Sequence, residues 1–243
     1  QIDTAVIQTI ESTSFINGPI VKEFASSLED YLDVKHVIPC ANGTDALQIA
    51  LMALDLKRGD EVITTNFSFA STIEVILLLG LKPVIVDIDP KTFNIDPSLI
   101  ESKITKKNCE SFIFKLKENT KKPKILVIGS GEKGSGTDLL WQDKDLEIHG
   151  VDIYVSTTVD VVCDAHYLPL ESKFYDGVWI QAVLEHVVEP HKVVKEIHRV
   201  LSNNGIVYAE TPFMQQVHEG AYDFTRFTVL GHRYLFRDFY ALD

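Results

Sequence analysis

Three glycines follow an apolar run near the middle of the 243-residue chain, and their spacing is that of a ligand-binding turn. The stretch ILVIGSGEKGSG carries Gly129, Gly131 and Gly134 as GxGxxG, between a predicted strand and a predicted helix. Glycine suits such a turn because a Cβ would oppose its backbone angles and keep a ligand off the main chain. Asp152, 23 positions after Gly129, would be able to accept both ribose hydroxyls of an adenosine-containing cofactor. The alternative is a tight strand-to-helix turn that binds no ligand.

A second acidic position helps to distinguish between two kinds of adenosine ligand, a dinucleotide and S-adenosylmethionine. A nicotinamide or flavin dinucleotide would place its pyrophosphate on the helix N-terminus. S-adenosylmethionine has no pyrophosphate and would place its amino-acid part in the loop. VVCDAHYLPL puts Asp164 after another predicted strand, where a carboxylate would accept the adenine amino group. FYDGVWIQAVLEHV then predicts a strand that opens into a loop at the carboxyl edge of the sheet, where open α/β sheets bind ligands. These features favour S-adenosylmethionine.

The elements that must position these residues alternate between helix and strand along the chain. Apolar spacing predicts helices at residues 19–32, 43–56, 71–80, 96–104, 137–143, 191–201 and 232–242. β-rich runs predict strands at residues 36–40, 61–65, 82–89, 124–129, 147–153, 159–165, 176–184 and 205–211, with an NNG turn before the last. Strands separated by helices form right-handed βαβ units. We therefore expect an α/β fold of two tandem parallel-sheet units, the second Rossmann-like.

Charge is distributed unevenly and marks a domain boundary. The chain has a net charge of −12, yet residues 106–124 hold seven lysines against two glutamates. A basic stretch between two acidic halves predicts a first segment at 1–105, a basic connecting segment at 106–123 and a second domain at 124–243. The apolar SFIFKL within it predicts a short helix or strand packed on a neighbour rather than a free linker.

Composition excludes several function classes. A net charge of −12 argues against non-specific nucleic-acid binding, which needs Lys and Arg to neutralise phosphates. No apolar run approaches the roughly 18–20 residues that cross a bilayer, and the opening QIDTAVIQTIE is not typical of a signal peptide. The three cysteines form no CxxC pair, so we expect no disulfide framework, no metal site and a cytoplasmic location.

From Lys124 to about Asp243 the ordered motifs resemble the class I S-adenosylmethionine-dependent methyltransferases, in particular members found among genes for cell-surface polysaccharides. The set consists of the glycine loop, Asp152, CDAHYLPL, DGVWIQAVLEHV, HKVVKEIHRVLSNNG and GIVYAETPF. Relative to that family the match is truncated at its C-terminal end, before two further strands. The resemblance implies that the methionine end of the cofactor is lined by Gly129, Ser130, Gly131 and Gly134. It further implies that Asp152 and Ile153 flank the ribose, that Asp164, Ala165 and His166 surround adenine, and that Gln181 closes the pocket.

Methyl transfer asks little of the protein beyond alignment, because the sulfonium is already activated. A general base is needed only when the acceptor is a hydroxyl or an ammonium group. His186, in LEHV beside the expected pocket, is the candidate base, since its ordinary pKa near ~6.5 suits proton removal at neutral pH. The alternative is a structural histidine. HEGAYDFTRFT, residues 218–228, is either an acceptor-binding lid or a surface loop; the acceptor itself is expected to be a small molecule or glycan-linked.

Residues 1–105 resemble the opening of the DegT/StrS-type nucleotide-sugar aminotransferases, which use pyridoxal phosphate on a fold-type-I scaffold. The resemblance rests on INGPIVKEFASSLEDYLDVKHVIPCANGTDALQIALMAL, GDEVITTNFSFASTIE and KPVIVDIDPKTFNIDPSLIE. It implies that Gly43 and Thr44 seat a phosphate at a helix N-terminus, unless they only cap the helix, and that Phe69 stacks on the pyridine ring. The family's Schiff-base lysine and pyridine-pairing aspartate lie beyond this opening, so we expect the segment to be inactive alone. The family is dimeric, which makes a homodimer an expectation. The alternatives to a methyltransferase function are an aminotransferase or a non-catalytic fusion of two degenerate segments.

Overall fold

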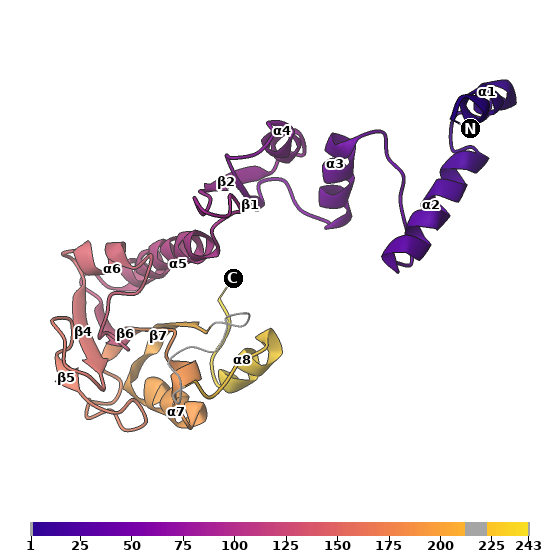
Figure 1. The fold of residues 1–243 in the computed structure, drawn as a ribbon. Helices are drawn as coiled ribbons and strands as arrows, with labels where there is room; N and C mark the ends of the chain where they lie inside the picture. The colour runs from indigo at the N-terminus through magenta and orange to yellow at the C-terminus, as the bar shows by residue number, and fades with distance from the viewer. Residues whose placement is uncertain (1, 212–222, 243) are drawn as a thin grey trace. The chain divides into compact units, whose positions relative to one another are not determined.

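The computed structural model describes residues 2–211 and 223–242 and divides into two compact units, Gln1–Asp96 and Pro97–Asp243 (Figure 1). The sequence-based boundaries at residues 105 and 123 stay predictions. Both units are α/β, and every strand pair in their two sheets is parallel. The predicted fold class of two tandem parallel-sheet units is therefore confirmed.

In its described residues, the first unit contains four helices and a two-stranded sheet, and the fourth helix is the one that packs on the strands. Its elements are α1 (Ile2–Ser12), α2 (Pro19–Leu32), α3 (Gly43–Ala53), β1 (Glu61–Thr65), α4 (Ser71–Leu78) and β2 (Lys82–Val86). The strands β1 and β2 pair in parallel from Glu61↔Lys82 to Thr65↔Val86. Helix α4 connects them and contacts both, as a crossover helix must when it joins parallel strands.

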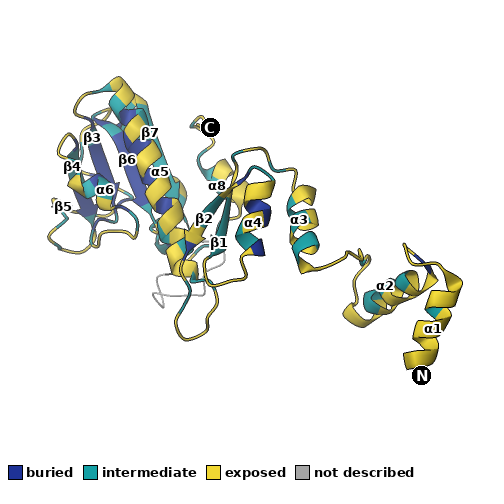
Figure 2. Ribbon diagram, turned by 90° about the horizontal axis from the view of Figure 1, so that it is seen from above, coloured by how far each residue is buried: buried dark blue, intermediate teal, exposed yellow. Residues whose placement is uncertain are grey.

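Burial in the first unit is concentrated at α4 and β2. Val75, Ile76, Leu81 and Val86 are its buried apolar residues, whereas no described residue of α1, α2 or α3 is buried (Figure 2). The strand predicted at residues 36–40 is wrong. These residues belong to no strand, and Ile38 is 73% exposed. A β-rich run becomes a strand only when a neighbouring strand pairs with it.

The second unit is built on a five-stranded parallel sheet with the order β5-β4-β3-β6-β7. Its strands are β3 (Lys124–Ile128), β4 (Glu147–Asp152), β5 (Val161–Val162), β6 (Tyr175–Gln181) and β7 (Leu201–Glu210). The chain proceeds outward from β3 to β4 and β5, then returns to the other side of β3 for β6 and β7. This reversal is the topological switch point of a doubly wound fold, and ligands bind beside it at the carboxyl ends of the strands.

Side chains alternate along each strand, so each face of the sheet has its own core. Ile125, Val127 and Trp179 lie on the face covered by α5 (Pro97–Asn119) and α6 (Asp138–Gln142). Residues next to them in sequence, such as Leu126 and Ile180, lie on the face covered by α7 (Pro190–Val200). Figure 2 shows β3 and β6 as the buried centre of this three-layer unit.

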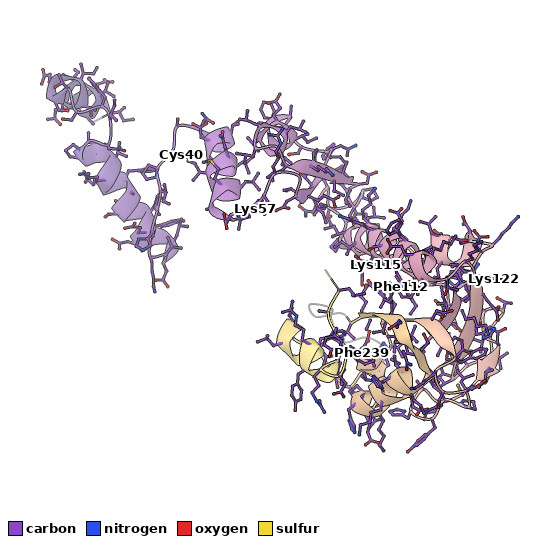
Figure 3. All side chains as sticks on the ribbon, turned by 180° about the vertical axis from the view of Figure 1, so that it is seen from behind. Cys40, Lys57, Phe112, Lys115, Lys122 and Phe239 are labelled. Atoms are coloured by element: carbon purple, nitrogen blue, oxygen red, sulfur yellow. The ribbon has the colours of Figure 1, made fainter. Side chains whose placement is uncertain are left out.

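Helix α5 includes most of the predicted basic connecting segment. Its buried residues are Thr105, Cys109, Phe112, Ile113 and Leu116, spaced as one helical face. Phe112, labelled in Figure 3, packs edge-to-face on Trp179 with ring centroids 5.4 Å apart. The lysines of α5 lie outside this apolar face; the Nζ of Lys117, for example, is 2.7 Å from the Asp143 carboxylate. The helix is therefore a packed layer of the second unit.

Several predicted elements of this unit differ from the structure: the helix predicted at residues 96–104 continues to Asn119, and the strand predicted at 176–184 ends at Gln181. The strand predicted at residues 159–165 is reduced to β5, because only Val161 and Val162 pair with β4. The NNG turn is a bulge inside β7, where the pairing shifts from Tyr175↔Leu201 to Gly177↔Ile206. The helix predicted to run to residue 242 is α8 (Val229–Leu235) and ends at Leu235. Across the described ranges, no helix combines the length and apolar character needed to cross a bilayer.

Candidate functional site

The glycine loop leaves β3 at the switch point, and its first glycine is required by geometry. Gly129 has φ +77°, a left-handed conformation that side chains disfavour. A Cβ at this position would lie 2.2 Å from Cγ2 of Val183, which follows β6. The bend after β3 and the loop after β6 therefore touch at the carboxyl edge of the sheet.

Asp152 lies at the end of β4, directly beside the glycine loop. Its Oδ2 accepts a hydrogen bond from the Gly131 N–H at 2.8 Å, and its Oδ1 accepts one from the Tyr154 N–H at 3.0 Å. A Cβ on Gly131 would come within 2.8 Å of the same Oδ2, so a larger residue here would have to displace the Asp152 carboxylate. Each carboxylate oxygen offers about two acceptor positions. The aspartate is therefore held by the main chain and still able to accept hydroxyl donors.

Gln181 approaches the loop from the end of β6. A Cβ on Gly134 would lie 2.4 Å from the Gln181 Oε1. The Gln181 Nε2 is 3.5 Å from the main-chain oxygen of Ser135. The structure thus brings three of the predicted positions, Gly131, Asp152 and Gln181, together around one loop.

Ser130 is placed differently from the other loop residues. Its hydroxyl is fully buried beside Gly150 of β4 and makes no hydrogen bond among the described residues. Its carbonyl accepts a short hydrogen bond from the Thr158 hydroxyl. The Ser130 N–H donates to the Val151 carbonyl at 3.2 Å, so the main chain of this residue is paired within the protein as well.

The predicted adenine-flanking residues follow β5. The Nδ1 of His166 lies 2.5 Å from Oδ1 of Asp164, and the His166 Nε2 accepts from the Glu189 N–H at 3.2 Å. Because Nε2 accepts, Nδ1 carries the hydrogen and donates a hydrogen bond to the Asp164 carboxylate. The His166 main-chain N–H, then its side chain, lower the pKa of Asp164 below the ordinary value. Ala165 is buried in the core.

The β4 and β5 ends meet at one edge, because the Cys163 N–H donates to the Asp152 carbonyl at 2.8 Å. Ile153, the predicted second ribose neighbour, is 59% exposed beside this contact. The positions predicted to flank the adenine and the ribose therefore lie next to each other at this edge of the sheet.

His186 ends a short 3-10 helix, η1 (Leu184–His186), after β6. Its Nε2 is 3.8 Å from Oε1 of Glu185, a fully buried carboxylate. The Glu185 carbonyl accepts from the Phe224 N–H at 2.8 Å, which connects η1 to the described end of the predicted lid. Residues 218–222 of that lid lie outside the described residues. The role of His186 as a base stays a prediction.

Sequence reasoning missed a polar group at the end of β7. Glu210 pairs with Gln181 in the strand register and accepts hydrogen bonds from Thr105 and Tyr208. Burial, with Glu210 nearby, raises the pKa of Tyr208, so the phenol stays protonated as a donor. One signal in the sequence could have indicated this group. Tyr208 and Glu210 are two positions apart near the end of a predicted strand, so their side chains are expected on the same face of the sheet.

The candidates of the first unit lie at two helix starts. Asn42 caps α3 by accepting the Asp45 N–H at 3.0 Å, and Gly43 and Thr44 begin the helix. Phe69 precedes α4 and is 79% exposed. The capping alternative thus has a direct contact, and the stacking role of Phe69 stays a prediction. Among the described residues, no three His, Cys, Asp or Glu side chains gather as metal ligands would.

Comparison with known families divides the chain in two. Residues 1–116 match the DegT/DnrJ/EryC1/StrS aminotransferase family, and residues 126–209 match a methyltransferase domain. The chain therefore joins a segment of that aminotransferase family to a methyltransferase domain, as the sequence resemblances predicted.

Individual relatives match the first part. The UDP-2-acetamido-2-deoxy-3-oxo-D-glucuronate aminotransferase of Pseudomonas aeruginosa is 50% identical over 105 residues, which are 43% of this chain and 29% of the relative. The 3-oxo-glucose-6-phosphate:glutamate aminotransferase of Bacillus subtilis is 43% identical over 98 residues, 40% of this chain and 22% of the relative. The chain thus spans less than a third of these relatives.

Two solved structures are similar to this chain over part of its length. A DegT DnrJ EryC1 StrS aminotransferase from Brucella abortus has 33% identity and a TM-score of 0.39, covering 61% of this chain and 39% of its own. A phosphoethanolamine N-methyltransferase 2 of Haemonchus contortus has 18% identity and a TM-score of 0.42, and the match covers 54% of this chain and 36% of that protein.

Proposed function

We propose that the second unit is an S-adenosylmethionine-dependent methyltransferase that acts on a small-molecule or glycan-linked acceptor. The observation that carries this proposal is the contact between Asp152 and the Gly131 N–H at 2.8 Å. It places a carboxylate with spare acceptor capacity beside a glycine loop, at the switch point of a parallel sheet. The match of residues 126–209 to a methyltransferase domain supports the same reading.

The residues at the carboxyl edge fit this cofactor. Gly129, Gly131 and Gly134 keep the loop free of side chains at positions where a Cβ would lie 2.2–2.8 Å from a neighbouring atom. Asp152 would accept hydrogen bonds from the ribose hydroxyls, and Gln181 would close the cofactor pocket beside the glycine loop. When bound, the cofactor supplies a methyl group already activated on a sulfonium.

The remaining predicted positions would hold the other parts of the ligand. Ile153 would flank the ribose, and Asp164, Ala165 and His166 would surround the adenine. Asp164 keeps acceptor capacity for an amino group because its contacts with His166 use a single oxygen, Oδ1. The chain's own task is then to align an acceptor with the sulfonium. For a hydroxyl or ammonium acceptor, His186 would take the proton at Nε2 or Nδ1.

The acceptor class rests on the adjoining segment. The first part of the chain is 50% identical to an aminotransferase named for a UDP-sugar, and 39% identical to the spore coat polysaccharide biosynthesis protein SpsC of Bacillus subtilis. A methyltransferase joined to such a segment would act on related sugar or polysaccharide intermediates.

Calorimetric titration with S-adenosylhomocysteine tests the cofactor assignment. We expect the full chain to bind, and Asp152→Asn to bind about 10- to 100-fold more weakly, since hydrogen bonds to a charged group contribute about 1.5–3 kcal/mol. The exposed carboxylate of Glu171 supplies a matched control, because Glu171→Gln makes the same chemical change away from the loop. Absence of binding by the unaltered chain at about 100 μM, a ligand concentration that would reveal even a weak site, would refute the proposal.

An aminotransferase activity of the first unit is the second candidate, favoured by its 50% identity over 105 residues. It predicts a visible absorption band, removed by borohydride, from pyridoxal phosphate joined to a lysine. We expect no such band, because the resemblance places the family's Schiff-base lysine beyond this segment. A non-catalytic fusion would show neither the band nor nucleoside binding.

A further inference from the structure

The glycine loop ends against the backbone of helix α5. Gly136 has φ +84°, and a Cβ there would lie 2.6 Å from the Ser102 main-chain oxygen and 2.9 Å from the Lys106 nitrogen. Main-chain atoms of a helix cannot move aside as a flexible side chain can. The position of α5 therefore limits where the end of the loop can lie.

Thr105 connects α5 to the ends of two strands. It is fully buried, and its Oγ1 lies 3.1 and 3.4 Å from the two carboxylate oxygens of Glu210. The same oxygen is 3.5 Å from the Nε2 of Gln181. A hydroxyl has one proton to donate and lone pairs to accept with. Thr105 therefore donates to Glu210 at the end of β7 and accepts from Gln181 at the end of β6.

Asn108, almost one turn further along α5, extends this network. Its Nδ2 donates to the Tyr208 hydroxyl at 3.2 Å, and Tyr208 donates to Glu210 through a short hydrogen bond. The Tyr208 ring stacks on Trp179 with centroids 3.9 Å apart. Because each of these polar groups has a partner, the network holds the ends of β6 and β7 in one arrangement.

The family match assigns most of helix α5 to the first part of the chain, whereas its packing places it in the second unit. The aminotransferase family match continues to residue 116, yet the whole of α5 belongs to the second unit and packs on its sheet. We propose that α5 is a working part of the methyltransferase site and that Thr105 is a positioning residue, which orients Gln181 against Gly134 of the cofactor loop. Sequence of the aminotransferase type thereby supplies an element of the neighbouring domain's binding site. This inference rests on the proposed function.

Calorimetric titration of full-length variants with S-adenosylhomocysteine tests the role of Thr105. Thr105→Val keeps the shape and removes the hydroxyl, so we expect about ten-fold weaker binding from the loss of the hydrogen bonds that orient Gln181. Thr105→Ser keeps the hydroxyl and should restore binding to near the unaltered value. Thr120→Val, the same change just beyond α5, is the matched control and should leave the affinity unchanged.

A melting curve for each variant separates positioning from packing. A lower melting temperature for Thr105→Val with unchanged affinity would overturn the inference while leaving the proposed function intact. Failure of the unaltered chain to bind would remove the proposed function, and this inference with it. Should Thr105→Val not fold, hydrogen exchange on the unaltered chain decides: bound ligand should slow exchange at residues 102–109 as well as 129–136. Slowing confined to 129–136 would overturn the inference.

Discussion

Gly129 is a position at which both the backbone conformation and a neighbouring side chain oppose a Cβ. Its φ of +77° is a left-handed conformation, and a Cβ added to it would meet Val183 at 2.2 Å. Gly43, by contrast, begins a helix and has open space where a Cβ would be. The two glycines therefore differ in their physical reason for being glycine.

We expect Gly129→Ala to lower the free energy of unfolding of the second unit by about 1–3 kcal/mol, through backbone strain and crowding against Val183. It should also weaken S-adenosylhomocysteine binding. Thermal and denaturant unfolding measure the first effect, and Gly43→Ala, with little expected change, is the control. Equal stability of Gly129→Ala and the unaltered chain would show that the loop accommodates a Cβ.

Helix α8 carries a half-buried titratable side chain, His232. Its ring packs against Phe236 and Phe227, with centroids 5.0 and 6.1 Å away, and its Nε2 has no hydrogen-bond partner among the described residues. Burial lowers the pKa of His232 below the ordinary 6.5. The folded state therefore binds this proton less readily than the unfolded state.

Above pH 6.5 His232 is neutral in both the folded and the unfolded state and does not lower the free energy of unfolding. As the pH falls from 6.5 towards the lowered pKa of the folded state, the unfolded state takes up the proton first, so the free energy of unfolding decreases. We expect the unaltered chain to lose melting temperature between pH 7.5 and 5.5, and His232→Phe to lose less, because phenylalanine cannot take up a proton. Differential scanning calorimetry at both pH values measures the change. His191→Gln, at an exposed histidine of α7, should behave like the unaltered chain. Parallel losses in the His232→Phe and unaltered proteins would contradict this account.

At the scale of the molecule, the two units differ in how much they bury. The second unit holds both of the apolar clusters that cover the five-stranded sheet. The first holds few buried residues, and α1 to α3 present large apolar side chains such as Phe24 and Met52 to solvent. Segments with few buried contacts open at low free energy.

Limited chymotrypsin digestion should therefore cleave the first unit before the second. We expect an early, persistent fragment that begins between α4 and α5 or earlier and retains the whole five-stranded sheet, identified by mass spectrometry. Native mass spectrometry of the intact chain is the companion measurement, since a homodimer would bury apolar side chains of the first unit and delay its cleavage. First cleavage inside α5 or β3 would contradict the expectation.

The chain's local patterns were sufficient to predict most elements. Helix α2 and strand β1 match their predicted bounds, because an amphipathic repeat and a β-rich run between turns are visible within a few residues. The strand predicted at residues 36–40 is wrong because strand formation also depends on a pairing partner elsewhere in the chain, which a local pattern does not reveal. The bulge in β7 likewise arises from the register with β6, which no local pattern contains.

The amino-acid sequence by itself determined most of the helices and strands, the two family segments and the glycine loop with its downstream aspartate, since each depends on residue type and short spacing. Only the tertiary structure decided that α5 belongs with the methyltransferase sheet, that the Ser130 hydroxyl is buried beside Gly150, and that Thr105 meets Glu210. Thr105 and Glu210 are 105 positions apart, and their contact exists because α5 packs across the sheet. Such contacts follow from the packing of whole elements, which residue spacing along the chain does not encode.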